Sequence, residues 1–396
     1  MNNKIKNLLE RGVVDVIEKD SLERKLNSSK KLRIKFGADP TAPDLHLGHA
    51  VALRKLKEFQ DLGHKIIFII GDFTAKIGDP SGKNKTRPPL SETEIKKNTQ
   101  TYLQQIGKIL DVQKIKIYKN SQWFSKMKLE DLIRLSAKLT VAKILERDDF
   151  EKRIKNKIEI YYHETLYPLL QAYDSVMVEA DVEIGGSDQI FNMLVGRDLQ
   201  KKMGQEPQDV LTVPLLVGLD GKEKMSKSLK NYVGFNETPQ EQFGKLMSLP
   251  DELIIQYMKL LTDIPAEEID EIEKKMKKKI VNPRDAKMRL AFEIVSFYHS
   301  EDEARKAKEE FERVFSRKEM PKEMPEVEVS QNKIKIIDFL AENNLVSSKS
   351  EARRLIEQKA VEINGEIIGD WRKETEVKDG AIMRIGKRKF IKIKLT

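Results

Sequence analysis

Two short segments of the sequence carry histidines and lysines at spacings that suit the binding of a nucleoside triphosphate. An HLGH tetrapeptide at 46–49 follows an apolar, strand-like run, and a KMSKS pentapeptide at 224–228 lies in a glycine-bracketed loop. Amides and imidazoles at a helix start can donate hydrogen bonds to phosphates and to the charge that grows on a leaving group. The ammonium groups of Lys224 and Lys227 can bind the β- and γ-phosphates. Together, the segments predict an ATP site.

Each segment alone allows a simpler interpretation. The histidines could be incidental at a surface helix start, or could form an i,i+3 metal pair that lacks further ligands. The lysines could belong to an ordinary basic loop. The presence of both segments, in this order, favours the nucleotide site over these alternatives.

The elements around the histidines predict a strand–helix–strand unit. Leu32–Gly37 reads as a strand, Leu45–Leu62 as a helix, and Lys65–Gly71 as a continuous apolar run typical of a buried parallel strand. Such a unit belongs to a doubly wound sheet with a right-handed crossover. His46 and His49 should therefore lie at the carboxyl edge of the sheet, where these folds bind ligands.

The rest of the chain predicts further units. Residues 90–180 read as mostly helical, with an amphipathic segment at Lys128–Glu146, and Val182–Gly186 and Asp209–Leu216 resume the sheet. Thr238–Phe315 reads as helical and highly charged, and Arg317–Gln331, with two prolines, reads as a linker.

The last 66 residues form a basic unit of their own. They contain 15 Lys+Arg against 10 Asp+Glu, and so carry +5 of the net charge of +9. Ser348-x-x-Glu351 predicts a capping box that opens a short basic helix. Asn364-Gly365 predicts a turn, and KRKFIKIKL predicts a terminal edge strand. This unit suits contact with a nucleic-acid backbone.

Composition excludes several classes of protein. The 396 residues, enough for two or three domains, include no cysteine, so disulfides and cysteine-ligated metal sites are excluded. The N-terminus lacks a signal-peptide core, and no apolar run approaches the roughly 20 residues of a membrane span. We expect a cytoplasmic protein, and the positive charge favours a polyanionic partner.

Three further segments carry a specific resemblance. Residues 164–175 (ETLYPLLQAYDS), 184–189 (IGGSDQ) and 77–83 (IGDPSGK) are similar to motifs of bacterial tyrosyl-tRNA synthetases, and HLGH and KMSKS match the HIGH and KMSKS signatures of class I synthetases. Residues 332–396 resemble the S-four-type RNA-binding domain of these enzymes. The resemblance covers nearly the whole chain, with its motifs in family order.

The resemblance implies a role for individual residues. It assigns catalysis to Thr41, His46, His49, Lys83, Arg87, Lys224 and Lys227. It assigns to Asp174 the binding of the substrate phenol, and to Asp79, Tyr167 and Gln171 the binding of the substrate ammonium group. It places Gln189 beside the substrate carboxylate. It assigns ATP binding to Gly37, Asp39, His46, Gly48, His49, Gly186, Asp188, Lys224, Met225 and Lys227. The residues that suit tRNA binding are Arg353, Arg354, Lys387 and Arg388.

Helix geometry agrees with the substrate assignment. Tyr167, Gln171 and Asp174 fall at i, i+4 and i+7, on one face of a helix. A buried carboxylate suits a phenol, and a second acidic group suits an ammonium ion. The alternative is a packed amphipathic helix with an exposed acid.

The resemblance also implies an architecture, a cofactor and partners. It predicts a Rossmann-like catalytic domain at 1–233, with a helical insertion near 120–165 and a KMSKS loop at 221–230. An α-helical domain at 234–316, a linker at 317–331 and a small α+β RNA-binding domain at 332–396 should follow. The implied substrates are ATP, L-tyrosine and tRNA(Tyr). Magnesium should enter with ATP and not through a protein-ligated metal site, and the chain should form a homodimer.

Two positions depart from the family pattern. Lys35 stands where many members have a tyrosine that contacts the substrate hydroxyl, so it replaces that contact or rearranges it. Lys359 stands where a glycine is usual.

Three alternative functions remain open. These are a tryptophanyl-tRNA synthetase, in which Asp174 has no phenol to read, a small nucleotidyltransferase with the HIGH signature, and a synthetase-derived RNA-binding protein without catalysis. The C-terminal unit argues against the first two, and the intact HLGH and KMSKS segments argue against the third.

Overall fold

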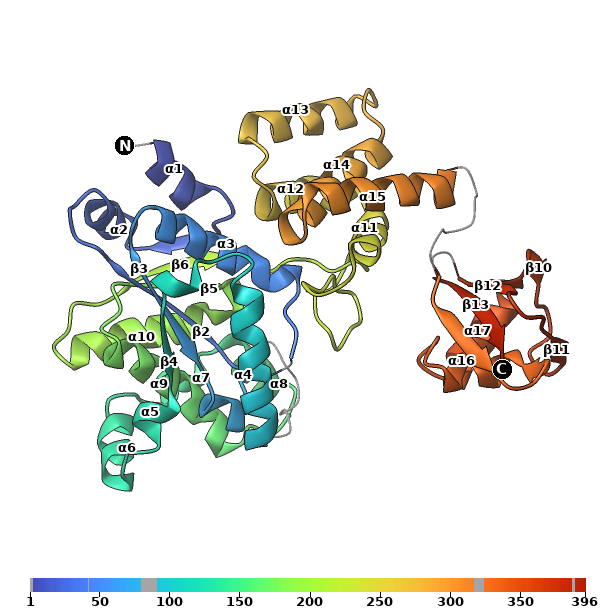
Figure 1. Cartoon of the computed structure of the whole chain (residues 1–396). Coiled ribbons are helices and arrows are strands. Elements are labelled where there is room, and N and C mark those ends of the chain that lie inside the picture. Colours follow the sequence, from blue (N-terminus) through green and yellow to red (C-terminus); the bar gives the residue numbers. More distant parts are fainter. Residues whose placement is uncertain (1–2, 42, 80–90, 317–323, 387–388) are drawn as a thin grey trace. The chain divides into compact units, whose positions relative to one another are not determined.

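The computed structural model describes residues 3–41, 43–79, 91–316, 324–386 and 389–396. It divides into two compact units, Met1–Ala304 and Arg305–Thr396, each described below by itself (Figure 1). None of the helices in the described ranges combines the length and apolar character needed to cross a membrane.

A six-stranded sheet forms the centre of the first unit. Its strands are β1 Asp15–Ile17, β2 Arg33–Ala38, β3 Lys65–Ile70, β4 Lys116–Lys119, β5 Val182–Gly186 and β6 Asp209–Val213. Their order is β1-β6-β5-β2-β3-β4, with β1 antiparallel to β6 and the other neighbours parallel. The four predicted strands, β2, β3, β5 and β6, are confirmed, and β1 and β4 are additions that the sequence analysis missed. The order reverses between β2 and β5, which is the topological switch point where such sheets bind ligands.

Helices of the first unit pack against this sheet, and further helices come after its last strand in the sequence (Figure 1). The helices before the last strand are α1 Asn3–Glu10, α2 Lys19–Leu26, α3 Leu47–Asp61, α4 Glu92–Ile106, α5 Ser121–Phe124, α6 Leu129–Ser136, α7 Val141–Leu145, α8 Asp148–Lys155, α9 Tyr162–Met177 and α10 Ile190–Lys202. Short 3₁₀ turns span Thr74–Lys76, Val112–Lys114, Ser187–Gln189 and Asp251–Leu253, and a π-helical turn at Glu312–Ser316 belongs to the second unit.

The amphipathic segment predicted at Lys128–Glu146 is not one helix. It divides into α6 and α7, because Thr140 begins a new helix by accepting a hydrogen bond from the backbone N–H of Lys143. The hydroxyl of an N-cap threonine satisfies an amide that would otherwise lack a partner in the first turn.

The charged region after the sheet is helical, as predicted. Its helices are α11 Pro239–Met247, α12 Ile254–Leu261, α13 Ala266–Lys277, α14 Pro283–Tyr298 and α15 Glu301–Phe311. The division between the two compact units falls within α15. The domain limits 1–233 and 234–316 stay predictions.

The second unit combines helices and strands around a core of its own. Its elements are β7 Glu326–Val329, β8 Lys333–Lys335, α16 Ile336–Glu342, α17 Lys349–Glu357, β9 Val361–Ile363, β10 Glu366–Ile367, β11 Glu374–Glu376, β12 Ile382–Ile385 and β13 Lys389–Leu395. Five strands pair in the order β10-β9-β12-β13-β7, and β8 pairs with β11. Asn364 and Gly365 both have positive φ and form the predicted turn between β9 and β10.

The structure corrects three expectations for this unit. The strand β13 is interior, because β7 pairs with it in parallel, so the expected linker at 317–331 contains a paired strand at its C-terminal end. The capping box is incomplete, since Ser348 Oγ accepts from Glu351 N, but the Glu351 carboxylate turns to Ser347. Lys359 adopts φ +55, a conformation that explains the usual glycine at this position.

Candidate active site

Polar residues gather where the parallel strands end. Asp39 follows β2, Thr74 follows β3, Asn120 follows β4 and Gln189 follows β5. Because the carboxyl ends of parallel strands share one edge, residues distant in the sequence meet there. The contacts below show that several residues assigned from the sequence lie in one hydrogen-bonded network.

The two histidines cap the first turn of α3. His46 is the N-cap, and its Nδ1 accepts from Gly48 N at 3.2 Å, while His49 Nδ1 accepts from His46 N at 3.2 Å. A Cβ at Gly48 would lie 2.9 Å from the His46 ring, so only glycine permits this arrangement. The amide of Leu47 donates to Val233 O. These amides have protein acceptors in this structure, and their hydrogen bonds to phosphates stay a prediction.

Both imidazoles are neutral hydrogen-bond donors. The pKa of His46 is lowered to about 2 and that of His49 to about 4, mainly by burial, and the charge of Lys227 contributes to both shifts. Since each Nδ1 accepts a hydrogen bond, each ring carries its proton on Nε2. The Nε2–H groups can therefore donate to an anionic oxygen without titrating near pH 7.

The KMSKS segment is attached to the histidine segment. His46 forms an isolated antiparallel bridge with Gly234, and Phe235 N donates to Leu45 O. Lys227 Nζ lies 2.9 Å from Asp44 Oδ2, and Lys224 Nζ lies 3.0 Å from Asp188 Oδ2. The structure thus brings the two motifs together, with both lysines held on carboxylates.

Asp174 is buried within a cluster of polar side chains. Its side chain is held by Trp123 Nε1 at 2.9 Å and Asn120 Nδ2 at 3.3 Å. Burial raises the pKa of Asp174 to about 7, although the charge of Lys35 and both hydrogen bonds favour the carboxylate. A carboxyl group held in this way can exchange a hydrogen bond with a buried hydroxyl, as reading a phenol requires.

A second branch of the hydrogen-bonded network joins Tyr167 to the cluster around Asp174. The Tyr167 hydroxyl donates to Asp39 Oδ2 at 2.9 Å, and Thr74 Oγ1 donates to Asp39 Oδ1 at 2.7 Å. Asn120 Nδ2 donates to Thr74 Oγ1 at 3.0 Å and so links Asp39 to Asp174. Burial and the nearby Asp39 raise the pKa of Tyr167 above its usual value, so its hydroxyl stays protonated.

The remaining substrate candidates form a hydrogen-bonded row. Gln189 Nε2 donates to Asp79 Oδ2 at 2.8 Å, and Asp79 Oδ1 lies 3.4 Å from Arg147 Nη2. Gln171 lies on the same helix as Tyr167 and donates through Nε2 to Glu183 Oε1 at 3.2 Å. Arg147 comes from the start of α8, within the predicted insertion.

Lys35 lies in a buried ion pair beside the substrate candidates of α9, and its effect on the substrate hydroxyl contact stays a prediction. It is completely buried, and its Nζ lies 2.8 Å from Glu183 Oε1. The same ammonium donates to Ser175 Oγ at 2.6 Å and to Gln171 O at 3.0 Å. Lys35 therefore links α9 to β2 and β5, because its hydrogen bonds to Ser175 and Gln171 are with groups of that helix.

Other candidates surround these networks. A Cβ at Gly37 would meet no atom within 4 Å, which leaves open space beside the end of β2. Thr41 N donates to Asp39 O, and Met225 is buried, with its N–H on Leu216 O. A Cβ at Gly186 would lie 2.8 Å from Asp188 Oδ1.

Four assigned residues cannot be placed. Lys83, Arg87, Lys387 and Arg388 lie outside the described residues.

The C-terminal candidates lie on α17. Arg353 is exposed, pairs with Glu357 Oε1 at 2.8 Å and stands over the Trp371 ring, with its Cζ 4.8 Å from the centroid. Arg354 is more exposed, and its Nη2 is 3.9 Å from Glu351 Oε1. Both guanidinium groups are therefore accessible to a phosphate backbone.

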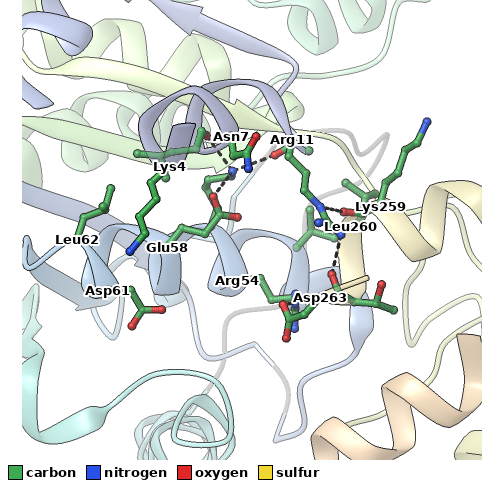
Figure 2. A pocket seen from close by; sticks show the side chains of 15 residues that line it. Lys4, Asn7, Arg11, Arg54, Glu58, Asp61, Leu62, Lys259, Leu260 and Asp263 are labelled. Carbon is green, nitrogen blue, oxygen red and sulfur yellow. Dashed lines mark hydrogen bonds and ion pairs between the residues drawn. The ribbon is translucent and has the colours of Figure 1, made fainter. Parts of the chain in front are cut away.

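A cavity of about 400 Å³ lies apart from this network, between α1, α3 and the end of α12 (Figure 2). Lys55 Nζ donates to the carbonyls of Leu8 and Arg11, each at 2.9 Å, and Arg11 donates to Thr262 O at 2.8 Å. Burial lowers the pKa of Lys55. These cations donate hydrogen bonds to backbone carbonyls at helix ends, which have no partner within their own helix. We therefore interpret the residues around the cavity as a structural contact between the helices.

Sequence reasoning missed several members of the site. Asn120 and Trp123 follow β4, whose sequence KIYK is largely exposed and lacks a buried apolar run. The end of an added edge strand would have indicated Asn120, but that strand was not recognised. Among the described residues, no three His, Asp or Glu side chains cluster as metal ligands would.

Family models match both parts of the sequence. Residues 27–316 match the class I tRNA synthetases (W and Y), and residues 317–393 match the tyrosine–tRNA ligase SYY-like C-terminal domain. The tyrosine–tRNA ligase of Thermotoga maritima is 56% identical over 98% of this chain and 96% of its own length. That of Aquifex aeolicus is 50% identical over 98% and 97%.

Solved structures share the fold. A C-terminally truncated mitochondrial tyrosyl-tRNA synthetase from Aspergillus nidulans superposes with a TM-score of 0.65 at 24% identity, covering 79% of this chain and 94% of its own. The Archaeoglobus fulgidus tyrosyl-tRNA synthetase, complexed with L-tyrosine, gives 0.62 at 21% identity over 77% and 99%. From the family models and the sequence identities, this chain belongs to the tyrosine–tRNA ligases, within the class I aminoacyl-tRNA synthetases.

Proposed function

We propose that this enzyme activates L-tyrosine with ATP and transfers the tyrosyl group to the 3′-terminal adenosine of tRNA(Tyr). The observation that carries the proposal is the buried Asp174 carboxyl, held by Trp123 and Asn120 beside Tyr167 and Gln171 on one helix. In this arrangement, the Asp174 carboxyl can hydrogen-bond the hydroxyl of a bound tyrosine. The polar groups near it can bind the ammonium and carboxylate groups of the amino acid.

In the first step, a tyrosine carboxylate oxygen attacks the α-phosphorus, and the bond to the β-phosphate oxygen breaks. The products are tyrosyl-adenylate and pyrophosphate. His46 and His49 donate from Nε2 to phosphate oxygens, a role for which their lowered pKa values suit them. Lys224 and Lys227 exchange their present carboxylate partners for the departing pyrophosphate, which stabilises the developing charge. Magnesium accompanies ATP and adds positive charge to the phosphates.

In the second step, a ribose hydroxyl of the terminal adenosine attacks the acyl carbon, and AMP leaves. The family resemblance favours the 2′-hydroxyl. No covalent enzyme intermediate is needed, so the enzyme acts by orientation and electrostatics. The basic C-terminal unit holds the tRNA. The cytoplasmic location expected from the sequence stays a prediction.

Pyrophosphate exchange with each of the twenty amino acids tests the amino-acid assignment. Tyrosine should support exchange at least about 100-fold better than phenylalanine, because phenylalanine leaves the buried Asp174 without its hydroxyl partner. If tryptophan alone gave exchange, the tryptophanyl alternative would replace the proposal. tRNA binding without exchange by any amino acid would support a non-catalytic RNA-binding protein.

We also propose that the insertion forms a homodimer contact. Seven of the seventeen exposed large apolar side chains on the described residues fall within 129–162. They are Leu129, Ile133, Val141, Ile154, Ile158, Tyr161 and Tyr162. Such a concentration is typical of a surface that a partner covers, and a second copy of this chain fits the proposal because the family resemblance implies a dimer.

Sedimentation tests this contact. Sedimentation equilibrium should give the unmodified chain a mass of about twice 45.8 kDa. In a Leu129→Asp, Tyr162→Asp double variant, the measured mass should shift toward that of the monomer, because buried charges destabilise an interface. Ile280→Asp, at an exposed apolar residue outside the insertion, is the matched control and should remain dimeric. A monomeric unmodified chain at micromolar concentration would contradict the proposal.

A further inference from the structure

Asn192 lies between the two glutamines of the candidate tyrosine site. It is in the first turn of α10, and only 1% of its surface is exposed. Its Nδ2 donates to Gln171 Oε1 at 2.9 Å and to Gln189 Oε1 at 3.0 Å. Both protons of one amide are therefore used on two residues to which the sequence assigns substrate binding, although Asn192 has no assigned role.

These two hydrogen bonds fix the direction of both glutamine amides. A glutamine side chain presents an acceptor oxygen on one side and a donor nitrogen on the other. Because each oxygen faces Asn192, Gln171 Nε2 points to Glu183 Oε1 and Gln189 Nε2 to Asp79 Oδ2. Reversing either amide would bring two donors together at Asn192 and two acceptors together at the carboxylate.

Charged groups hold the two ends of this row. Glu183 is buried, and Lys35 Nζ lies 2.8 Å from it. Asp79 lies beside Arg147 at 3.4 Å. Because a cation lies beside each carboxylate, each carboxylate accepts a hydrogen bond from its glutamine. The hydrogen bonds along the row therefore have one favourable donor-to-acceptor direction, and Asn192 joins the two halves of the row.

We propose that Asn192 is a positioning residue for tyrosine binding, which acts by orienting the amides of Gln171 and Gln189. This inference rests on the proposed function. In the fixed orientation, Gln171 Oε1 keeps a lone pair for the substrate ammonium. Gln189 Nε2 keeps a proton for the substrate carboxylate. Asn192 donates both protons of its amide to the glutamines and need not contact the substrate.

Two substitutions test the proposal in pyrophosphate exchange. Asn192→Leu keeps the size but removes the donors, and Asn192→Ser is too short to reach both glutamines. Each variant should raise KM for tyrosine about 10- to 100-fold, the size expected when one or two substrate hydrogen bonds lose their orientation. KM for ATP should stay within about 2-fold, and kcat should change less than KM for tyrosine.

The matched control is Gln200→Leu on the same helix. Gln200 is also buried, and its amide donates to Ala180 O at 2.9 Å and to Ser175 O at 3.4 Å and accepts from Gln208 N at 2.8 Å, so these hydrogen bonds go to neither Gln171 nor Gln189. It should lower the melting temperature as much as the Asn192 variants do, yet leave KM for tyrosine unchanged. An equal rise in KM for Gln200→Leu would show a general folding effect and overturn the inference.

The outcomes separate the inference from the function on which it rests. If the unmodified chain exchanges with tyrosine but both Asn192 variants keep KM within about 2-fold, the inference alone is wrong. If the unmodified chain shows no tyrosine-dependent exchange, the proposed function fails, and the inference fails with it. If Asn192→Leu does not fold, Asn192→Ser decides the question.

Discussion

Asp174→Asn should lower kcat/KM for tyrosine in pyrophosphate exchange by about 100-fold or more. The carboxyl of Asp174 accepts from Trp123 and Asn120, and we propose that it also meets the substrate hydroxyl. An asparagine offers one acceptor oxygen in place of two and turns an NH₂ group toward an existing donor. Losing a hydrogen bond to a charged or buried partner costs about 3 kcal/mol, which corresponds to about 100-fold.

Asp181→Asn serves as the matched control for this substitution. Asp181 is also a buried aspartate, but it precedes β5 and pairs with Lys30 at 2.7 Å, at the opposite end of the strand from Gln189. Its loss should reduce stability and leave kcat/KM for tyrosine within about 2-fold. Unchanged kcat/KM in Asp174→Asn would remove Asp174 from the site.

Asp174→Asn should also change how the free energy of unfolding depends on pH. Burial raises the pKa of Asp174 from 3.8 to about 7, so the folded state holds a proton that the unfolded chain releases. The stability from this proton is present below pH 4 and is lost as the pH rises through 7. Between pH 5 and pH 8, the unmodified chain should lose roughly 2–3 kcal/mol of unfolding free energy relative to Asp174→Asn. A constant difference in chemical denaturation would show that Asp174 does not titrate in this range.

Deleting residues 317–396 should separate the two steps of the reaction. Tyrosine-dependent pyrophosphate exchange should stay within about 2-fold, because the residues assigned to it lie before residue 230. Aminoacylation should fall by about 100-fold or more, since the deletion removes the basic unit and its phosphate contacts. Normal charging of tRNA(Tyr) by the truncated enzyme would rule out a role for this unit.

The structure decides where this deletion should begin. A cut at residue 331, the end of the expected linker, would leave β7 without its partner β13 and expose an unpaired strand to aggregation. Arg354→Glu in the full chain provides a milder test at an exposed side chain. It should raise KM for tRNA and leave exchange unchanged, whereas Lys278→Glu on the exposed end of α13 should change neither.

The sequence alone could predict the parts of the site whose geometry is local. The apolar run of β3, the helix start at His46 and the spacing of Tyr167, Gln171 and Asp174 depend on the period of one strand or one helix. Family motifs then allowed residues to be assigned along the chain. Such patterns report which face of an element is buried, and the structure agrees with them.

Only the tertiary structure could decide which elements are neighbours. The alternating lysines of β13 suggested an edge strand, but alternation reports one buried face and says nothing about the pairing partner β7. The lysine-rich β4 had no apolar pattern, so Asn120 could not be placed beside Asp174.

The contacts of buried polar side chains depend on the tertiary structure in the same way. The ion pair of Lys35 with Glu183 joins positions 148 residues apart, on two strands that meet at the switch point. Asn192 joins Gln171 to Gln189 because α9 and α10 pack together. Local periodicity determined which residues point inward, whereas the packing of distant elements determined which of their polar atoms meet.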